Sequence, residues 1–347
     1  MKKRRKVTDL TEKYKFVKRF VRPKEEKKKK PHASEATKTL VEQTVVEKNE
    51  DFRSGFIAII GRPNVGKSTL MNQLIGQKVA IMSDKPQTTR NRIVGVLHSQ
   101  EGQAVFLDTP GIHKPKHKLG EIMVTTARKT LSEVDLIFYV VDVTMEPGGG
   151  EEYISNLLKG LKTPIFLVVN KMDAIGREEG LQRIAQYSTL VDWKEVIPIS
   201  AIKNNNLDRL KELIFQILPR GPLYYPADAI TDQPEKLLMA ELIREKVLIA
   251  MREEIPHSVA VVIEHLQERQ KGPLVVHGTI FTERKSQKGM LIGKGGSMLK
   301  QIGMEARIEI EKLLGTSIYL ELWVKVKEDW RSRPDVLRSF GYDEKFE

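Results

Sequence analysis

The sequence predicts an α/β protein in which a parallel sheet wound on both faces is followed by a smaller α+β domain. Apolar runs suited to buried strands alternate with helical patterns from residue 55 to residue 218, the arrangement of a parallel sheet covered by helices on both faces. After a Pro-rich break, the order changes to α-β-β-α-α-β. A chain of 347 residues is long enough for two or three separate cores.

Composition excludes several classes of site. The chain has no Cys, which excludes disulfides, thiolate zinc sites, iron–sulfur ligation and Cys nucleophiles. It has no apolar run long enough to cross a membrane, and no apolar segment follows the basic N-terminus as in a secretory signal. We therefore expect a cytoplasmic protein.

The net charge of +12 is concentrated at the N-terminus. Residues 1–30 hold 15 Lys and Arg against four Asp and Glu, which leaves a net charge of +1 for the rest. We expect residues 1–53 to be a basic, disordered extension and linker, because blocks of like charge resist folding. Two other interpretations remain open: contact with RNA phosphates, helped by base stacking on Tyr14, Phe16 and Phe20, and a helix on a membrane surface.

An eight-residue phosphate-binding motif follows the first predicted strand. The strand covers residues 56–60, and a helical pattern runs from residue 69 to residue 75 before Gly76. Between them lies G-x-x-x-x-G-K-[ST], whose backbone N–H groups wrap around phosphate oxygens at a helix N-terminus. We expect Lys67 to reach the β- and γ-phosphates and Ser68 to bind Mg²⁺. The residues of the motif, all predicted to bind the nucleotide, are Gly61, Arg62, Pro63, Asn64, Val65, Gly66, Lys67 and Ser68.

A second motif follows the strand at residues 104–107, which leads into Asp108, Thr109, Pro110 and Gly111. The carboxylate of Asp108 suits Mg²⁺, directly or through water, and Gly111 offers a backbone N–H to the γ-phosphate.

A polar segment at residues 87–91, before the strand at residues 93–97, carries Thr88 and Thr89. One of them is expected to close over Mg²⁺ and the γ-phosphate and to release after hydrolysis. The spacing does not choose between the two. The predicted Mg²⁺ ligands are Ser68, Asp108 and Thr89.

Base selection is predicted from the strand at residues 165–169, which leads into Asn170, Lys171, Met172 and Asp173. The carboxylate of Asp173 can accept hydrogen bonds from the ring N–H and the amine of guanine, a donor pair that adenine lacks. Ser200 and Ala201 follow the strand at residues 196–199, and their backbone can donate to guanine O6. The motifs, in this order and at the carboxyl ends of strands, predict a site for GTP or GDP with Mg²⁺.

The residue after Gly111 is Ile112, where many GTPases place a Gln that orients the attacking water. Ile has no hydrogen-bonding atom in its side chain, so backbone, a monovalent ion, a switch-region side chain or a partner must position the water. We therefore assign no catalytic residue and expect slow intrinsic hydrolysis.

The remaining elements complete two domains. A buried strand is predicted at residues 135–142, with helices near residues 119–132, 150–161, 178–191 and 207–218. The first domain is expected over residues 54–221 and a linker over 222–235. The second domain and its tail are expected over 236–347, with a helix at 236–253, strands at 259–263, 274–281 and 318–326, and a helix ending at residue 314.

The second domain contains a G-x-x-G turn between two helices. Such a turn lets backbone N–H groups approach sugar-phosphate oxygens, as in RNA-binding KH modules. Residues 284–300 hold five basic residues and no acid, which favours a local basic groove. The predicted RNA-binding residues are Arg284, Lys285, Lys288, Gly293, Lys294, Gly295, Gly296 and Lys300.

The chain resembles the Era GTPase family over residues 54–343. The resemblance rests on the phosphate loop, Gln87–Asn91, the D-T-P-G and N-K-M-D motifs, Ile199–Ala201 and the G-x-x-G turn, and the ending Leu337–Asp343 is similar to that family's tail. The apolar Ile112 also matches that family. The resemblance implies a GTP-hydrolysing P-loop domain and a type II KH domain. It implies an assembly factor of the small ribosomal subunit that binds the 3′ end of 16S rRNA and acts in 30S maturation. It also implies peripheral contact with the cytoplasmic side of the cell membrane. We expect a monomer.

Two other functions remain open at this point. One is a membrane-associated regulatory GTPase. The other is a nucleotide-gated RNA-binding protein with negligible hydrolysis, which the apolar Ile112 leaves possible.

Overall fold

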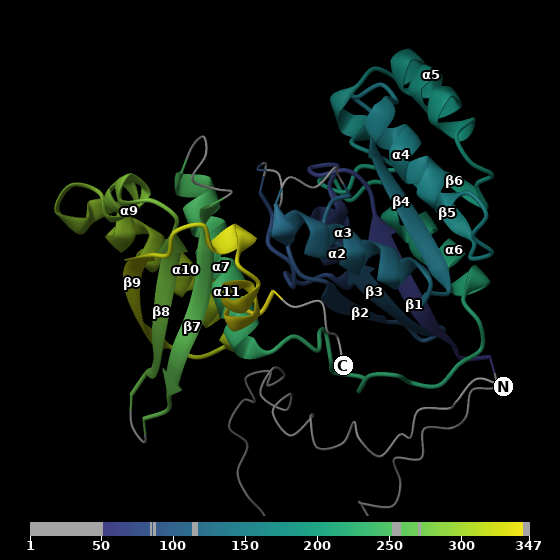
Figure 1. Ribbon diagram of the computed structural model, residues 1–347. Coiled ribbons are helices and arrows are strands. Elements are labelled where there is room, and N and C mark those ends of the chain that lie inside the picture. The colour runs from purple at the N-terminus through teal and green to yellow at the C-terminus, as the bar shows by residue number, and fades with distance from the viewer. Residues whose placement is uncertain are drawn as a thin grey trace, which may run out of the picture.

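The computed structural model describes residues 51–83, 85, 88–112, 117–251, 258–269 and 272–342. The predicted N-terminal extension therefore lies almost wholly outside the described residues, and the structure does not test its three interpretations. Figure 1 shows two bodies side by side, each built on its own sheet and joined by an extended segment.

The first domain is a six-stranded sheet of order β2-β3-β1-β4-β5-β6. Five of the strands are parallel, as predicted. The edge strand β2 is antiparallel to β3, because the short connection between them cannot make the crossover that parallel strands need. The strands are β1 (Arg53–Ile60), β2 (Ile93–His98), β3 (Gly102–Asp108), β4 (Leu136–Asp142), β5 (Ile165–Asn170) and β6 (Glu195–Pro198).

Helices cover both faces of this sheet because side chains alternate along each buried strand. Ile57 and Ile59 of β1 pack with residues of α2 and α6. Ala58 and Ile60 face the other way and pack with residues of α3, α4 and α5. The helices are α2 (Lys67–Ile75), α3 (Lys118–Leu131), α4 (Gly149–Leu158), α5 (Arg177–Ser188) and α6 (Leu207–Ile217).

The segment predicted as a linker, residues 222–235, lies along the edge strand β2. Val96 N donates to Ile230 O (2.9 Å), and the Thr231 hydroxyl donates to Val94 O (2.6 Å). The Gln103 side chain accepts from two backbone N–H groups of the same segment. The segment therefore covers a strand edge that would otherwise expose unpaired backbone groups.

The second domain has the predicted order α-β-β-α-α-β. Its strands pair as β7-β8-β9, antiparallel and then parallel, and apolar residues of α7, α9 and α10 form its core against them. The elements are α7 (Glu235–Ala250), β7 (Ala260–Gln267), β8 (Leu274–Thr282), α9 (Lys285–Ile292), α10 (Ser297–Leu314) and β9 (Ile318–Val326).

The chain then forms a short 3-10 helix, η5 (Trp330–Ser332), and α11 (Pro334–Ser339), neither of which the sequence pattern predicted. Trp330 and Leu337 are fully buried and form one apolar cluster with Leu119 and Met123 of α3. Figure 1 shows α11 on the side of the second domain that faces the first. The end of the second domain therefore packs on a helix of the first.

Candidate functional sites

A cavity of about 500 Å³ opens at the carboxyl ends of the strands of the first domain. Most of the predicted nucleotide-binding residues line it, as expected for a ligand at the edge of a doubly wound sheet. These residues are Pro63, Asn64, Gly66, Lys67, Ser68, Gly111, Asn170, Lys171, Asp173 and Ala201, with both Thr88 and Thr89.

The phosphate loop is held open for an anion by its backbone. Gly66 is the N-cap of α2 at φ 97°, and no side chain caps the helix, so N–H groups of the first turn remain available to phosphate. A Cβ on Gly66 would lie 2.3 Å from Asn170 Nδ2, so only Gly fits. The Asn170 amide donates to Val65 O (2.9 Å) and so ties the loop to the base-reading motif.

Lys67 lies at the base of this loop. Its Nζ donates to the carbonyl of Arg62 (2.8 Å) and is 3.3 Å from that of Gly61. Burial lowers the pKa of Lys67 to about 8, although the negative charge of Asp108 opposes the shift. A buried ammonium whose pKa is lowered by desolvation is a strong partner for phosphate.

The residues predicted to bind Mg²⁺ lie together. Ser68 Oγ donates to Asp108 Oδ2 (2.6 Å), and Thr89 Oγ1 lies 2.9 Å from Ser68 Oγ and 3.4 Å from Asp108 Oδ2. Thr88 instead turns its hydroxyl to Lys85 O (2.5 Å). Of the two threonines that spacing left open, Thr89 is the one beside Ser68.

This group fits Mg²⁺. Asp108 Oδ1 is buried and has no hydrogen-bond partner among the described residues, and burial raises the pKa of Asp108 to about 6. A cation at this carboxylate would supply the missing partner, and hydroxyl and carboxylate oxygens are the ligands that Mg²⁺ prefers.

The base-reading motif is preorganised. The Ser200 hydroxyl donates to Asp173 Oδ1 (2.5 Å), and Asn170 Oδ1 accepts from Ala201 N (2.9 Å). Lys171, at the left-handed φ of 67°, pairs its Nζ with Asp142 Oδ2 (2.5 Å). The two predicted base-reading segments therefore support each other across the cavity wall.

Other predicted residues do not line the cavity. Arg62 pairs with the buried Glu151 of α4 (3.1 Å), Thr109 Oγ1 donates to Ile59 O (2.8 Å), and Val65 packs in the core. A Cβ on Gly111, which does line the cavity, would lie 2.8 Å from Pro63 N, so Gly is required where the D-T-P-G motif touches the phosphate loop. Gly61, Asp108, Pro110, Met172 and Ser200 also do not line the cavity, although Asp108 is hydrogen-bonded to Ser68, which does.

Sequence reasoning missed part of the cavity wall. Ile81, Met82 and Ser83 line it, as does Ile202, whose side chain is 70% exposed. The signal available in the sequence was the apolar Ile202 directly after Ser200 and Ala201, since an apolar side chain there can cover a flat base. Residues 81–83 carry no motif.

Ile112 turns away from the cavity. Its side chain is 2% exposed and packs in the core, and its N–H donates to Gly61 O (3.1 Å). No hydrogen-bonding side chain therefore stands at this position to orient water. The next four residues lie outside the described part of the chain.

The G-x-x-G turn joins α9 to α10 through a 3-10 turn, η4 (Lys294–Gly296). Gly293, Gly295 and Gly296 all have positive φ, at 72°, 60° and 81°, and nothing lies within 4 Å of a Cβ built on Gly295 or Gly296. The turn therefore presents open backbone.

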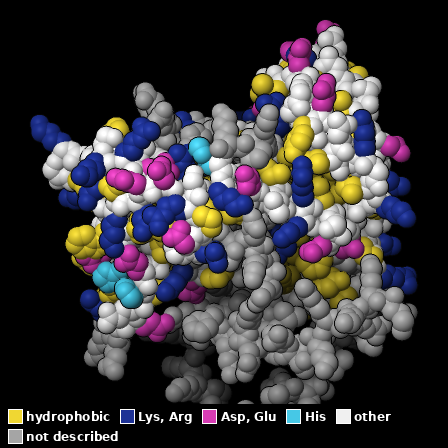
Figure 2. Space-filling view, viewed as in Figure 1, with side chains coloured by type: hydrophobic (Ala, Val, Ile, Leu, Met, Phe, Trp, Pro, Cys, Tyr) yellow, Lys and Arg dark blue, Asp and Glu magenta, His cyan; other side chains and the backbone are white. Residues whose placement is uncertain are grey.

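Basic side chains surround this turn. Lys285, Lys294 and Lys300 are exposed, and no ion pair joins them to an acid within the described ranges. Figure 2 shows Lys and Arg side chains around the α9 end of the second domain. Of the other predicted RNA-binding residues, Arg284 is the N-cap of α9 and Lys288 lies within that helix.

Comparison with known proteins gives two family matches. The model described as a 50S ribosome-binding GTPase matches residues 56–171, and that of the KH domain matches residues 254–331. A curated relative, GTPase Era of Heliobacterium modesticaldum (strain ATCC 51547 / Ice1), is 77% identical over 298 residues. The match covers 86% of this chain and 100% of the relative.

Two solved structures are similar over both domains. One is Aquifex aeolicus Era, as a variant bound to GDP and AlF4⁻, and the other is Era in complex with MgGDPNP and nucleotides 1506–1542 of 16S ribosomal RNA. For each the TM-score is 0.81 at 45% identity, covering 84% of this chain and 99% of the solved one. On the strength of these likenesses, and of a site with the arrangement described above, this chain belongs to the Era family of GTPases.

Proposed function

We propose that this protein is a GTP-hydrolysing ribosome-assembly factor that binds the 3′ end of 16S rRNA through its KH domain and acts in 30S maturation. The observation that carries the proposal is the likeness to Era solved with MgGDPNP and 16S rRNA. The preorganised nucleotide cavity and the open, basic G-x-x-G turn support it from this chain's own residues.

In this proposal each motif of the GTPase domain has one task. Backbone N–H groups of the loop at residues 61–68 hold the phosphates, and Lys67 neutralises charge on the β- and γ-oxygens. Ser68, Asp108 and Thr89 hold Mg²⁺, which when bound stabilises the negative charge that develops as the γ-phosphate leaves. Asp173 accepts hydrogen bonds from guanine, and Ser200 keeps its carboxylate in place.

Hydrolysis then depends on a water that Ile112 does not position. The position of the water falls to backbone, a monovalent ion, a switch-region group or a bound partner, and we expect slow turnover without one. We propose that RNA bound at the KH domain is this partner.

The KH domain is proposed to bind single-stranded RNA at the G-x-x-G turn. Open backbone at Gly295 and Gly296 allows close approach of sugar-phosphate oxygens, and Lys294 adds a charge at the turn. The half-buried apolar side chains of Ile292 and Leu299 flank the turn and suit unstacked bases.

A cytoplasmic monomer with peripheral membrane contact stays a prediction. None of the helices in the described part of the chain is long and apolar enough to span a bilayer.

The double substitution Lys294→Asp with Gly295→Asp tests the RNA site. It should abolish binding of an oligonucleotide with the 16S 3′-end sequence, measured by fluorescence anisotropy, and leave GTP affinity unchanged. Lys312→Asp with Ser317→Asp makes the same change of charge at the far end of α10 and should bind RNA normally. If both double variants bind RNA equally well, the G-x-x-G turn is not the RNA site.

The same oligonucleotide tests whether hydrolysis belongs to the function. Addition of RNA should raise the rate of GTP turnover. No stimulation, together with undiminished ribosome binding after Lys67→Ala, would favour the nucleotide-gated binding protein instead.

A further inference from the structure

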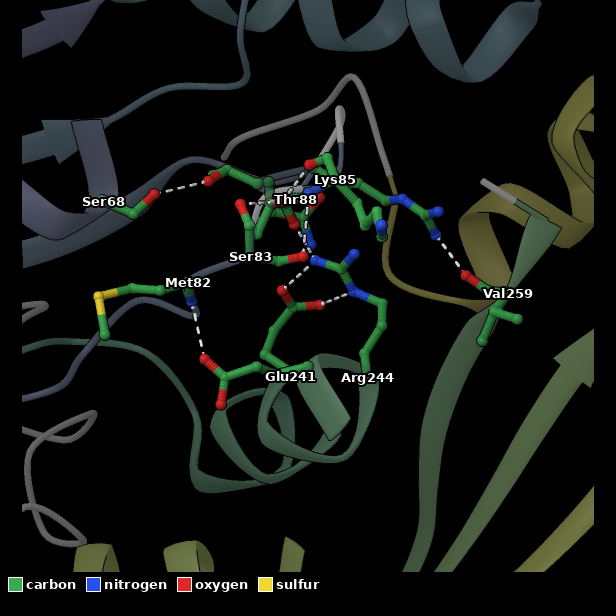
Figure 3. A network of polar contacts seen from close by, with 12 residues as sticks. Ser68, Met82, Ser83, Lys85, Thr88, Glu241, Arg244 and Val259 are labelled. Carbon is green, nitrogen blue, oxygen red and sulfur yellow. Dashed lines mark hydrogen bonds and ion pairs between the residues drawn. The ribbon is translucent and has the colours of Figure 1, made fainter. Parts of the chain in front are cut away.

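The second domain forms hydrogen bonds with the segment of the GTPase domain that carries Thr89. Met82 N donates to Glu245 Oε1 (2.8 Å), the carbonyl of Thr88 accepts from Arg244 Nη2, and Arg90 Nη1 donates to Val259 O (2.6 Å). Figure 3 shows these contacts as one network between α7, the segment around Thr88 and the start of β7. The GTPase cavity therefore lies on one side of this segment and the KH domain on the other.

Arg244 is the central contact in this network. Its side chain is fully buried, and Glu241, one helical turn earlier on α7, holds the guanidinium through Nε (2.9 Å) and Nη2 (2.6 Å). A guanidinium that donates two hydrogen bonds to one carboxylate has a fixed plane. Its contact with Thr88 therefore has a defined direction.

The Thr88 carbonyl bears directly on Thr89. The carbonyl and the following N and Cα belong to one planar peptide unit, so a hydrogen bond that fixes Thr88 O also fixes the Cα of Thr89. The side chain of Thr89 extends from that Cα to Ser68 Oγ (2.9 Å) and toward Asp108 (3.4 Å).

We propose that Arg244, on α7 of the second domain, is a positioning residue for GTP hydrolysis: by holding the Thr88 carbonyl it sets the Thr89 hydroxyl beside Ser68 and Asp108. This inference rests on the proposed role of Thr89 at Mg²⁺. If Arg244 has this role, the GTPase site is complete only while α7 contacts the segment around Thr88. Any partner that moves α7 then changes the rate of hydrolysis.

Two variants of the full chain test it. Arg244→Gln with Glu241→Gln removes the contact without leaving the partly buried Glu241 carboxylate unpaired, and Arg244→Lys keeps the positive charge and a donor group. The matched control is Arg331→Gln with Glu283→Gln, which removes a similar Arg–carboxylate pair (2.5 Å) within the KH domain.

We expect the Arg244 and Glu241 double variant to lower the single-turnover hydrolysis rate by about tenfold or more, since small displacements at a reacting centre have effects of this order. It should also require more Mg²⁺ for half-maximal rate and bind a GTP analogue more weakly, with GDP affinity unchanged. Arg244→Lys should recover part of the rate. A residue that only stabilises the fold would not separate GTP from GDP in this way.

Thr89→Ala, measured in the same assay, separates the positioning role of Arg244 from the proposed role of Thr89 at Mg²⁺. If Thr89→Ala is slow and the Arg244 variants match the parent protein, the positioning role is wrong and the proposed function stands. If Thr89→Ala hydrolyses GTP at the parent rate, the proposed role of Thr89 fails, and the role of Arg244 fails with it. If the double variant does not fold, Arg244→Lys decides: a rate and Mg²⁺ requirement equal to those of the parent would overturn the proposal.

Discussion

Asp173 is the residue on which base selection is predicted to depend. A carboxylate that accepts two hydrogen bonds from guanine gains about 1.5–3 kcal/mol from each, and the Ser200 hydroxyl on Oδ1 holds it in one orientation. Asp173→Asn replaces an acceptor by a donor, so the variant should bind GTP more weakly and prefer xanthosine nucleotides. Competition with labelled GDP measures the preference.

The control is Asp208→Asn, which changes an exposed acid on α6 and should keep the preference for GTP. An Asp173→Asn protein that still prefers GTP over xanthosine triphosphate would contradict the assignment of the base-reading carboxylate.

Two buried groups of the nucleotide site, Lys67 and Asp108, have pKa values shifted in opposite directions. Phosphate beside Lys67, whose pKa is about 8, raises that pKa, so MgGDP binding at pH 8 should take up roughly half a proton. Mg²⁺ requires the carboxylate of Asp108, whose pKa is about 6, so binding at pH 6 should release roughly half a proton. Calorimetry in buffers of different ionisation enthalpy measures both.

The Asp108→Asn variant separates the two contributions. It should lose the release at pH 6. The uptake at pH 8 should persist or increase, because loss of the Asp108 charge lowers the pKa of Lys67 further. Proton uptake at both pH values, or proton release at both, in the parent protein would show that Lys67 and Asp108 do not determine the proton change on MgGDP binding.

At the scale of elements, motif and periodicity predicted most of the structure. Each strand of the GTPase sheet was expected within a few residues, since buried parallel strands give continuous apolar runs. The two exceptions have different causes. The antiparallel direction of β2 depends on the length of its connection, and α11 is six residues long, too short for a helical period to be recognised.

The candidate site was predicted to the same extent. Residues within motifs, such as Lys67 and Asp108, carry their chemistry in their spacing, and the structure brings them together. Arg244 belongs to no motif, and Arg90 lies in the polar segment at residues 87–91 without a role predicted for it. Only the packing of the two domains brings Arg244 and Val259 to the segment around Thr88. A sequence pattern records neighbours along the chain, so contacts formed by docking leave no local signal.

The packing of α11 on α3 is predicted to contribute to stability. Leu337 is fully buried in the cluster that joins these helices, so Leu337→Ala should lower the free energy of unfolding by about 2–5 kcal/mol. Leu181→Ala makes the same change at a side chain that is 59% exposed on α5 and should cost less than about 0.5 kcal/mol. Urea unfolding followed by Trp fluorescence compares them. Equal midpoints for the two variants would show that α11 is not stably docked.

At the scale of the whole molecule, the charge is distributed very unevenly. Residues 1–30 carry nearly all of the net charge of +12, and the five basic residues around the G-x-x-G turn belong to a domain that is close to neutral. Two basic regions therefore lie far apart in the sequence. The turn is proposed to bind RNA, and the N-terminal extension has three competing interpretations.

Salt dependence distinguishes these interpretations. Each phosphate neutralised by a Lys or Arg releases condensed counterions, so the slope of log affinity against log salt counts phosphate contacts at roughly 0.7 per contact for single strands. If the extension contacts RNA phosphates, deletion of residues 1–30 should flatten this slope for ribosome or RNA binding, because fewer counterions are released. The Lys294→Asp and Gly295→Asp variant should instead lose affinity at every salt concentration.

An unaltered slope after deletion would leave two interpretations of the extension, a solvated tail and a membrane-surface helix. Binding of the full chain and of the deleted chain to anionic vesicles at physiological salt would then decide between these two.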